Sequence, residues 1–257
     1  MIDWEKLRYT TLSHKGVEVD NIPLGLPIVG KKVNDGYQAF LQDSTKGIDT
    51  HFRTMVELLG KHAVHFDGGD EILHPFAGIG LTARVIDDIL WKAKAETVVH
   101  TFWERDEVCV EYLVDSGRYD EEEDTIYQVE DSYQEVTADV LLDFDHVMWD
   151  PTSGTIKTKG MVEFWNKADM AEVKFVWLTD SACSKIWLHR EHYRPEFGRR
   201  IEDAEDYMRA YQGYLNQRGF VICDVARERD VTYSAIWNKK YVPEGITPWD
   251  GEQIVRY

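Results

Sequence analysis

A chain of 257 residues, of which 43% are hydrophobic and 30% charged, is long enough for one large globular domain or a domain with an extension. Its formal net charge of −18 is opposite to that of proteins that bind nucleic acid mainly through phosphate contacts. Three widely separated cysteines, without a CxxC pair, argue against a disulfide framework or a structural zinc site and suit a reducing cytoplasm. No apolar run approaches transmembrane length and the polar start is unlike a signal peptide, so we expect a cytoplasmic protein without membrane contact.

Residues 1–68 are expected to form an N-terminal extension of loops and one helix. In the segment GIDTHFRTMVELLGKHA (47–63), Ile48, Phe52 and Met55 recur at helical spacing. The glycines of FDGGD (66–70) then interrupt the chain before the first strand. The sequence therefore predicts that a separate α/β domain begins near residue 69 and runs to residue 257.

Strands alternate with helices in this second domain. The expected strands are 71–75, 97–103, 125–129, 146–149, 173–180, 220–227 and 232–241, and the expected helices are 81–95, 107–116, 161–171 and 203–219. Such alternation predicts a parallel sheet with helices on both faces. The last two strands lie four residues apart and are expected to pair antiparallel, which gives a mixed, mostly parallel sheet of seven strands.

The segment FAGIG (76–80) follows the first expected strand and precedes a helix. Gly78 and Gly80 allow a tight turn and a close approach of backbone to a ligand. The helix N-terminus that follows favours a carboxylate or a phosphate. A tight turn without any ligand explains the same two glycines equally well.

Three later acids fall at strand ends, where ligands bind in open parallel sheets. Glu104 ends the second strand and can accept both hydroxyls of a ribose. Asp131 follows the third strand, where an acid can read an adenine amino group. Asp150, followed by Pro151, closes the fourth strand and is expected to lie nearest the chemistry. The pattern predicts a nucleoside held along the strand ends.

The segments FAGIG, WERDEVCVEYL (103–113) and DPTSG (150–154) resemble those of class I S-adenosylmethionine-dependent methyltransferases. The resemblance covers about residues 71–241 and implies a Rossmann-like α/β sandwich that binds S-adenosylmethionine. It implies that the cofactor is bound by His74, Phe76, Ala77, Gly78, Gly80, Glu104, Arg105, Asp131, Ser132 and Asp150. Asp150 and Pro151 would border the substrate and take part in catalysis.

Two positions depart from the family pattern. His74 stands where the family usually has an acid, and a neutral imidazole offers no negative charge to the cationic end of the cofactor. Asp150-Pro151-Thr152-Ser153 lacks the aromatic residue that enzymes methylating exocyclic amino groups carry in this motif. No cysteine lies where the cytosine-C5 enzymes have their nucleophile. The sequence thus carries neither of the two best-known signatures of DNA-base methylation.

Charge is distributed unevenly along the chain. Residues 104–150 hold 17 acids against Arg105 and Arg118, whereas residues 151–200 hold nine Lys/Arg against six Asp/Glu. A nucleic acid, either RNA or DNA, is therefore expected to meet the 151–200 loops, where aromatic residues accompany the cations. The candidate substrate-binding residues are Thr152, Ser153, Lys157, Lys185, Trp187 and Arg190. A solvated helix and loop with ordinary ion pairs explains the same segment.

The histidine pairs His62/His65 and His189/His192 lack the neighbouring carboxylates or cysteines of a metal site, so no metal is expected. Three functions remain open from the sequence. The leading one is methyl transfer from S-adenosylmethionine, with a nucleic-acid base as a possible acceptor. The second is a non-catalytic protein on this fold, such as a cofactor sensor or a structural or decoy protein. The third is a Rossmann-type oxidoreductase, although the third small residue of GxGxxG/A is not clearly present.

Overall fold

The computed structural model describes residues 55–78, 80–115, 119, 124–130, 132–150, 158–180, 192–194, 197–228 and 231–256. The chain divides into two compact units, which are described one at a time. The first unit comprises residues 1–70 and 77–130, and the second comprises residues 71–76 and 131–257. The predicted boundary after residue 68 remains a prediction.

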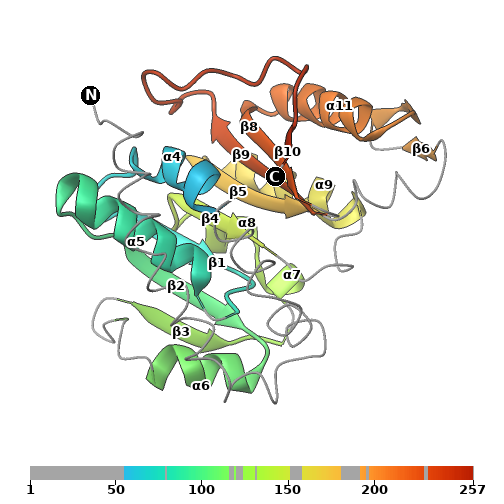
Figure 1. Cartoon of the computed structure of the whole chain (residues 1–257). Helices are drawn as coiled ribbons and strands as arrows, with labels where there is room; N and C mark the ends of the chain where they lie inside the picture. Colours follow the sequence, from blue (N-terminus) through green and yellow to red (C-terminus); the bar gives the residue numbers. More distant parts are fainter. Residues whose placement is uncertain are drawn as a thin grey trace. The chain divides into compact units, whose positions relative to one another are not determined.

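In the first unit, two parallel strands pack against helices (Figure 1). Strands β2 (Val99–Glu104) and β3 (Thr125–Gln128) pair in parallel, from Thr101 opposite Thr125 to Glu104 opposite Gln128. The described helical elements of this unit are η2 (Met55–Leu59), α4 (Gly60–Ala63), α5 (Leu81–Lys94) and α6 (Glu107–Asp115). The elements η2 and α4 coincide with the described end of the helix predicted at 47–63.

Helix α6 is amphipathic and packs one side into the core of the first unit. Its buried side contributes Cys109 and Leu113, while Glu107, Glu111 and Val114 are exposed, which is the spacing of an amphipathic helix. Leu113 joins a buried cluster that contains Ala77, Ala83 and Phe102, with Tyr119 and Ile126 packed against it. This cluster connects the residues before α5 with β2, β3 and α6.

In the second unit, the strand order is β10-β8-β9-β5-β4-β1. The bounds are β1 (Glu71–His74), β4 (His146–Trp149), β5 (Phe175–Asp180), β8 (Phe220–Glu228), β9 (Val231–Asn238) and β10 (Val255–Arg256). Strands β1, β4 and β5 are parallel, and β9 runs antiparallel to both β5 and β8. This arrangement confirms the predicted mixed, mostly parallel α/β sheet with an antiparallel hairpin near its end.

The described helices of the second unit are α7 (Ser132–Glu135), α8 (Ala138–Leu141), α9 (Thr158–Ala171) and α11 (Ala204–Asn216). The two long ones, α9 and α11, bury aromatic residues. Phe164 of α9 packs on Trp149 of β4, with ring centroids 4.3 Å apart. On α11, Tyr207, Tyr211 and Tyr214 are buried at positions i, i+4 and i+7 and surround Phe197. These contacts attach both helices to this unit's core.

Several short elements were not expected from the sequence. They are α7, α8, the antiparallel pair β6 (His192–Arg194) and β7 (Arg199–Ile201), and the two-residue strand β10. Strand β10 pairs with the outer edge of β8, opposite Ala226 and Arg227. Just before it, the Trp249 N–H donates to the Ile222 carbonyl at 2.8 Å. The C-terminal segment thereby covers an edge of β8 that would otherwise expose unpaired backbone groups.

Candidate functional site

The glycine turn between β1 and α5 is closed by backbone hydrogen bonds. The Gly80 N–H donates to the Ala77 carbonyl at 2.9 Å, and the Ala77 N–H donates to the Trp103 carbonyl of β2 at 3.0 Å. Both glycines have positive φ, 55° at Gly78 and 74° at Gly80, where residues with a Cβ are strained. Gly80 is the N-cap of α5, so the turn leads directly into the N-terminus of a 14-residue helix.

The space beside Gly80 leaves no room for a side chain. A Cβ on this residue would lie 2.9 Å from both Leu113 Cδ2 and the hydroxyl of Tyr119. The backbone therefore packs directly on these two side chains. Glycine is needed at this position for its conformation and also for the close packing of the turn.

Glu104 at the end of β2 closes the turn from another side. Its Oε2 accepts a hydrogen bond from the Gly78 N–H at 2.7 Å, and its Oε1 accepts from the Arg105 and Asp106 N–H groups, both at 2.8 Å. The structure thus brings together the two predicted features of the nucleoside site, the glycine turn and the acid of β2. A carboxylate has about four acceptor positions, so about one is left for a further donor.

Two residues near Glu104 in the chain, Arg105 and Cys109, differ in their exposure to solvent. The Arg105 side chain is exposed, whereas the Cys109 thiol lies in the core. Burial, followed by the negative charges of Glu104 and Asp106, raises the pKa of Cys109 to about 12. This thiol therefore stays protonated at neutral pH and cannot act there as a thiolate nucleophile.

His74 and Phe76, two of the predicted cofactor residues, lie in the second unit. His74 ends β1 and is buried, with 1% of its surface exposed. Phe76 packs edge-on against Trp149, with ring centroids 5.1 Å apart. Ser132, another predicted cofactor residue, is buried at the start of the short helix α7. Their contact with a cofactor remains a prediction.

Asp150 follows β4, and its partly buried carboxylate accepts a hydrogen bond from the hydroxyl of Thr179 on β5. Burial raises the pKa of Asp150 from 3.8 to about 6, and the hydrogen bond from Thr179 opposes this rise. Thr179 is 3% exposed and was missed by the sequence reasoning. Its hydroxyl within the apolar run FVWL-T was the only signal for it.

The other predicted site residues lie outside the residues that the structure describes. They are Asp131, Pro151, Thr152, Ser153, Lys157, Lys185, Trp187 and Arg190. Of residues 151–200, the structure describes 158–180, 192–194 and 197–200. Several cations in these ranges have partners in the protein.

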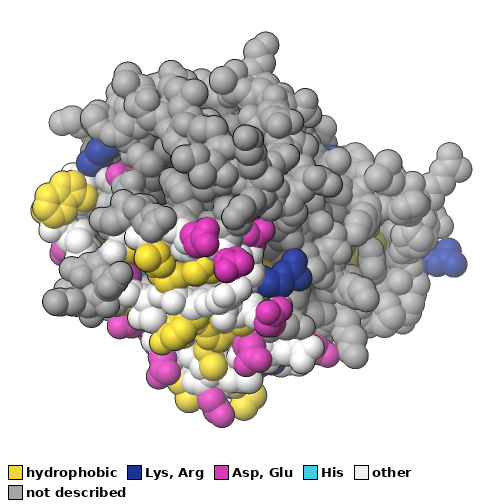
Figure 2. Space-filling model, turned by 90° about the horizontal axis from the view of Figure 1, so that it is seen from below, with side chains coloured by type: hydrophobic (Ala, Val, Ile, Leu, Met, Phe, Trp, Pro, Cys, Tyr) yellow, Lys and Arg dark blue, Asp and Glu magenta, His cyan; other side chains and the backbone are white. Residues whose placement is uncertain are grey.

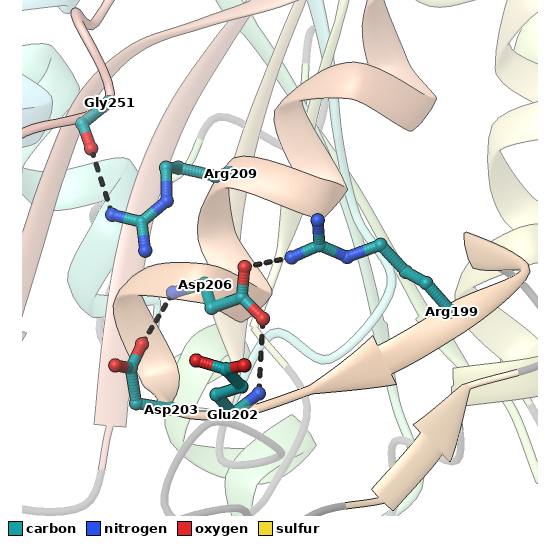
Figure 3. Close-up of polar contacts among 6 residues, drawn as sticks. All are labelled: Arg199, Glu202, Asp203, Asp206, Arg209 and Gly251. Carbon is teal, nitrogen blue, oxygen red and sulfur yellow. Dashed lines mark hydrogen bonds and ion pairs between the residues drawn. The ribbon is translucent and has the colours of Figure 1, made fainter.

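Lys167 donates to the Val136 carbonyl at 2.7 Å, and Lys174 pairs with Asp145 at 2.9 Å. Arg199 of β7 pairs with Asp206 of α11, and the second oxygen of Asp206 accepts the Glu202 N–H (Figure 3). These three cations belong to the nine on which the local positive balance of residues 151–200 depends. The described part of this segment therefore offers less free positive charge than its sequence indicates.

In the part of the chain that Figure 2 draws in colour, acidic side chains lie among hydrophobic ones. In the first unit, Val114 of α6 and Tyr127 of β3 are exposed hydrophobic residues. Among the described residues, no group of three His, Cys, Asp or Glu side chains is placed to hold a metal ion. Nor does this part of the chain contain a helix of the length and apolarity that crossing a membrane requires.

No protein-family model matches this chain, and no curated protein matches it in sequence. Solved structures similar to it include a provisionally assigned RNA methyltransferase from Pyrococcus horikoshii, with 15% identity, a TM-score of 0.42, and coverage of 74% of this chain and 82% of that one. A provisionally assigned class I S-adenosylmethionine-dependent methyltransferase from Listeria monocytogenes has 12% identity and a TM-score of 0.46, with coverage of 81% and 64%. Precorrin-6y C5,15-methyltransferase from Geobacter metallireducens has 11% identity and a TM-score of 0.43, with coverage of 70% and 85%.

With TM-scores below one half and identities this low, the similarities assign no activity to this chain.

Proposed function

We propose that this protein transfers a methyl group from S-adenosylmethionine to a nitrogen of a nucleic-acid base. The observation that carries the proposal is the 2.7 Å hydrogen bond from the Gly78 N–H to Glu104. It joins a glycine turn at a helix N-terminus to an acid at the end of the next strand, which is the combination that a nucleoside with an anionic end requires.

The residues present fit this cofactor. The N-terminus of α5, entered through Gly80, favours the carboxylate of the methionine part. The remaining acceptor position of Glu104 suits one ribose hydroxyl. Asp131 and Ser132 are the residues proposed to face the adenine. When bound, the cofactor supplies an electrophilic methyl group on a positively charged sulfur.

Asp150 is the residue proposed to handle the proton. Transfer of this methyl group to a nitrogen would leave the bonding electron pair on sulfur and a surplus proton on the nitrogen. The Asp150 carboxylate would accept that proton and pass it to water. Because the pKa of Asp150 is raised to about 6, this carboxylate is largely ionised at neutral pH but binds a proton more readily than an exposed aspartate.

Thr179 supports this role by fixing the carboxylate. The hydroxyl donates to one oxygen of Asp150, which leaves the other oxygen available to an acceptor N–H. Positioning of this kind supplies much of the rate in an in-line displacement. Thr179→Val should therefore slow transfer while leaving cofactor affinity unchanged.

A nucleic-acid acceptor is supported by the cations and aromatic residues of the 151–200 loops. The net charge of −18 and the internal pairing of Lys167, Lys174 and Arg199 oppose it. The acceptor is therefore expected to bind through local contacts to a base rather than through many phosphates. Such binding depends weakly on salt, because few counterions are released.

The test is transfer of a labelled methyl group to total RNA, to DNA and to a protein extract, across a range of pH. The proposal predicts labelling of RNA or DNA, with a rate that rises through about pH 6 and then levels off. Asp150→Asn should lower the rate by at least about a hundredfold, within the usual range for a general base. Asp143→Asn, at an exposed acid before the same strand, should have no effect.

Labelling of protein alone would contradict the proposed acceptor. Cofactor binding without transfer to any of the three would instead support the non-catalytic function left open by the sequence. Full activity of Asp150→Asn would show that Asp150 does not accept the proton.

A further inference from the structure

Tyr119 contacts the glycine turn of the first unit at Gly80. Its hydroxyl donates a hydrogen bond to the Gly80 carbonyl at 3.2 Å. The same hydroxyl, together with Leu113, occupies the space that a Cβ on Gly80 would need. Tyr119 therefore contacts the turn at Gly80 through one hydrogen bond and one packing contact, whereas Glu104 contacts it at Gly78.

The ring of Tyr119 is itself held in place. It packs on Phe102 with centroids 4.5 Å apart and meets His100 edge-on at 6.0 Å. The His100 ring lies 2.9 Å from an Asp87 oxygen on α5, and its backbone N–H donates to Asp124 at 2.7 Å. The hydroxyl is thus presented to Gly80 from a buried, well-packed support rather than from a freely rotating side chain.

We propose that Tyr119 is a positioning residue for the methionine end of the cofactor. The inference rests on the proposed function, because it concerns the same site. Tyr119 fixes the carbonyl of Gly80 and so the direction of the first turn of α5, while Glu104 fixes Gly78. The two side chains hold the turn at its two glycines, and only Glu104 is also placed to reach a ribose.

This division of roles predicts a selective effect. S-adenosylhomocysteine carries the amino-acid end that faces the helix N-terminus, whereas 5′-methylthioadenosine lacks it. Loss of the Tyr119 hydroxyl should weaken binding of the first ligand and spare the second. A general loosening of the fold would weaken both in the same proportion.

The experiment is calorimetric titration of the whole chain with each of the two ligands, for wild type, Tyr119→Phe and Tyr127→Phe. Tyr127 is a matched control because it is an exposed tyrosine on β3 of the same unit. We expect Tyr119→Phe to bind S-adenosylhomocysteine about fivefold more weakly, the effect of one ordinary hydrogen bond, and to bind 5′-methylthioadenosine as wild type does. Tyr127→Phe should match wild type for both ligands.

Equal affinities of Tyr119→Phe and wild type for S-adenosylhomocysteine would overturn the inference, as would equal weakening of both ligands. A wild-type protein that binds neither ligand would contradict the proposed function instead. In that case, amide hydrogen exchange of the ligand-free protein still tests the structural part. Exchange at Gly80 and Leu81 should be faster in Tyr119→Phe, with exchange in β5 unchanged, and unchanged exchange at the turn would also overturn the inference.

Discussion

The hydroxyl of Thr179 on β5 donates a hydrogen bond to the carboxylate of Asp150, which follows the neighbouring parallel strand β4. This bond compensates only part of the cost of burying the acid, because the pKa of Asp150 stays raised at about 6. An acid kept at a cost in stability is typical of functional sites.

Asp150→Asn should make the protein more stable at neutral and higher pH. The folded-state pKa of Asp150 is about 6 and its ordinary value is 3.8, so between these values the folded state binds the proton more tightly than the unfolded one. The contribution of this group to stability is therefore fully present below about pH 4 and is lost as pH rises to about 6. We expect the variant to exceed wild type by about 2 kcal/mol above pH 6, allowing for screening at a partly buried site.

Urea unfolding of both proteins from mildly acidic to mildly alkaline pH measures this difference. Asp143→Asn serves as the control, because Asp143 is exposed. A difference between Asp150→Asn and wild type that shrinks as pH rises would have the wrong sign for a buried acid. No difference at any pH would mean that Asp150 is effectively solvated.

Gly80→Ala should destabilise the first unit. The added Cβ would lie 2.9 Å from Leu113 and Tyr119, at a backbone φ of 74°. We expect a loss of about 1–3 kcal/mol in the free energy of unfolding, since the strain at positive φ and the overlap act together. Thermal unfolding or urea denaturation measures it.

Gly213→Ala is the matched control for this substitution. Gly213 lies inside α11, and apart from its chain neighbours and the nearby backbone of its own helix, nothing lies within 4 Å of the position where its Cβ would be. In an exposed helix interior the same change should stabilise by about 0.5–1 kcal/mol. If both substitutions had the same sign, the close packing of the glycine turn would be refuted.

Gln212→Leu should weaken the attachment of the C-terminal segment. The Gln212 side chain accepts the Ile222 N–H at 3.2 Å and donates to the Trp249 carbonyl at 2.9 Å. Ile222 borders the bulge of β8, where the regular pairing with β9 shifts. Leucine would leave both backbone groups without this partner, at a cost of about 2 kcal/mol.

Limited proteolysis of the C-terminal segment and urea unfolding both report this change. Gln217→Ala, at the exposed C-cap of α11, should leave both unchanged. A Gln212→Leu protein with wild-type stability and protease resistance would show that Trp249 is held without the glutamine.

Much of the fold could be predicted because apolar runs and turn residues carry local signals. The strands β1, β4 and β5 are short buried runs, and the glycines of FAGIG are preceded by one of them. Glu104 could be selected because it ends β2. The helices α7 and α8 have only four residues each, too few for a hydrophobic period to show.

The supporting side chains could not be predicted for a different reason. Thr179 and Tyr119 are ordinary residues in the sequence, and each acts on a residue far away in the chain. Thr179 is 29 positions from Asp150 and Tyr119 is 39 from Gly80. Only the folded arrangement shows these contacts, in the same way that it shows Arg199 to be paired with Asp206.

The most direct measurement is calorimetric titration of S-adenosylhomocysteine into wild type, Glu104→Ala and Glu111→Ala. Glu111 is the control because it is an exposed acid on α6. Wild type and Glu111→Ala should bind alike. Glu104→Ala should bind at least about tenfold more weakly, because alanine accepts a hydrogen bond neither from the Gly78 N–H nor from a ribose hydroxyl. Absence of binding by wild type, or equal binding by wild type and Glu104→Ala, would contradict the proposed cofactor site.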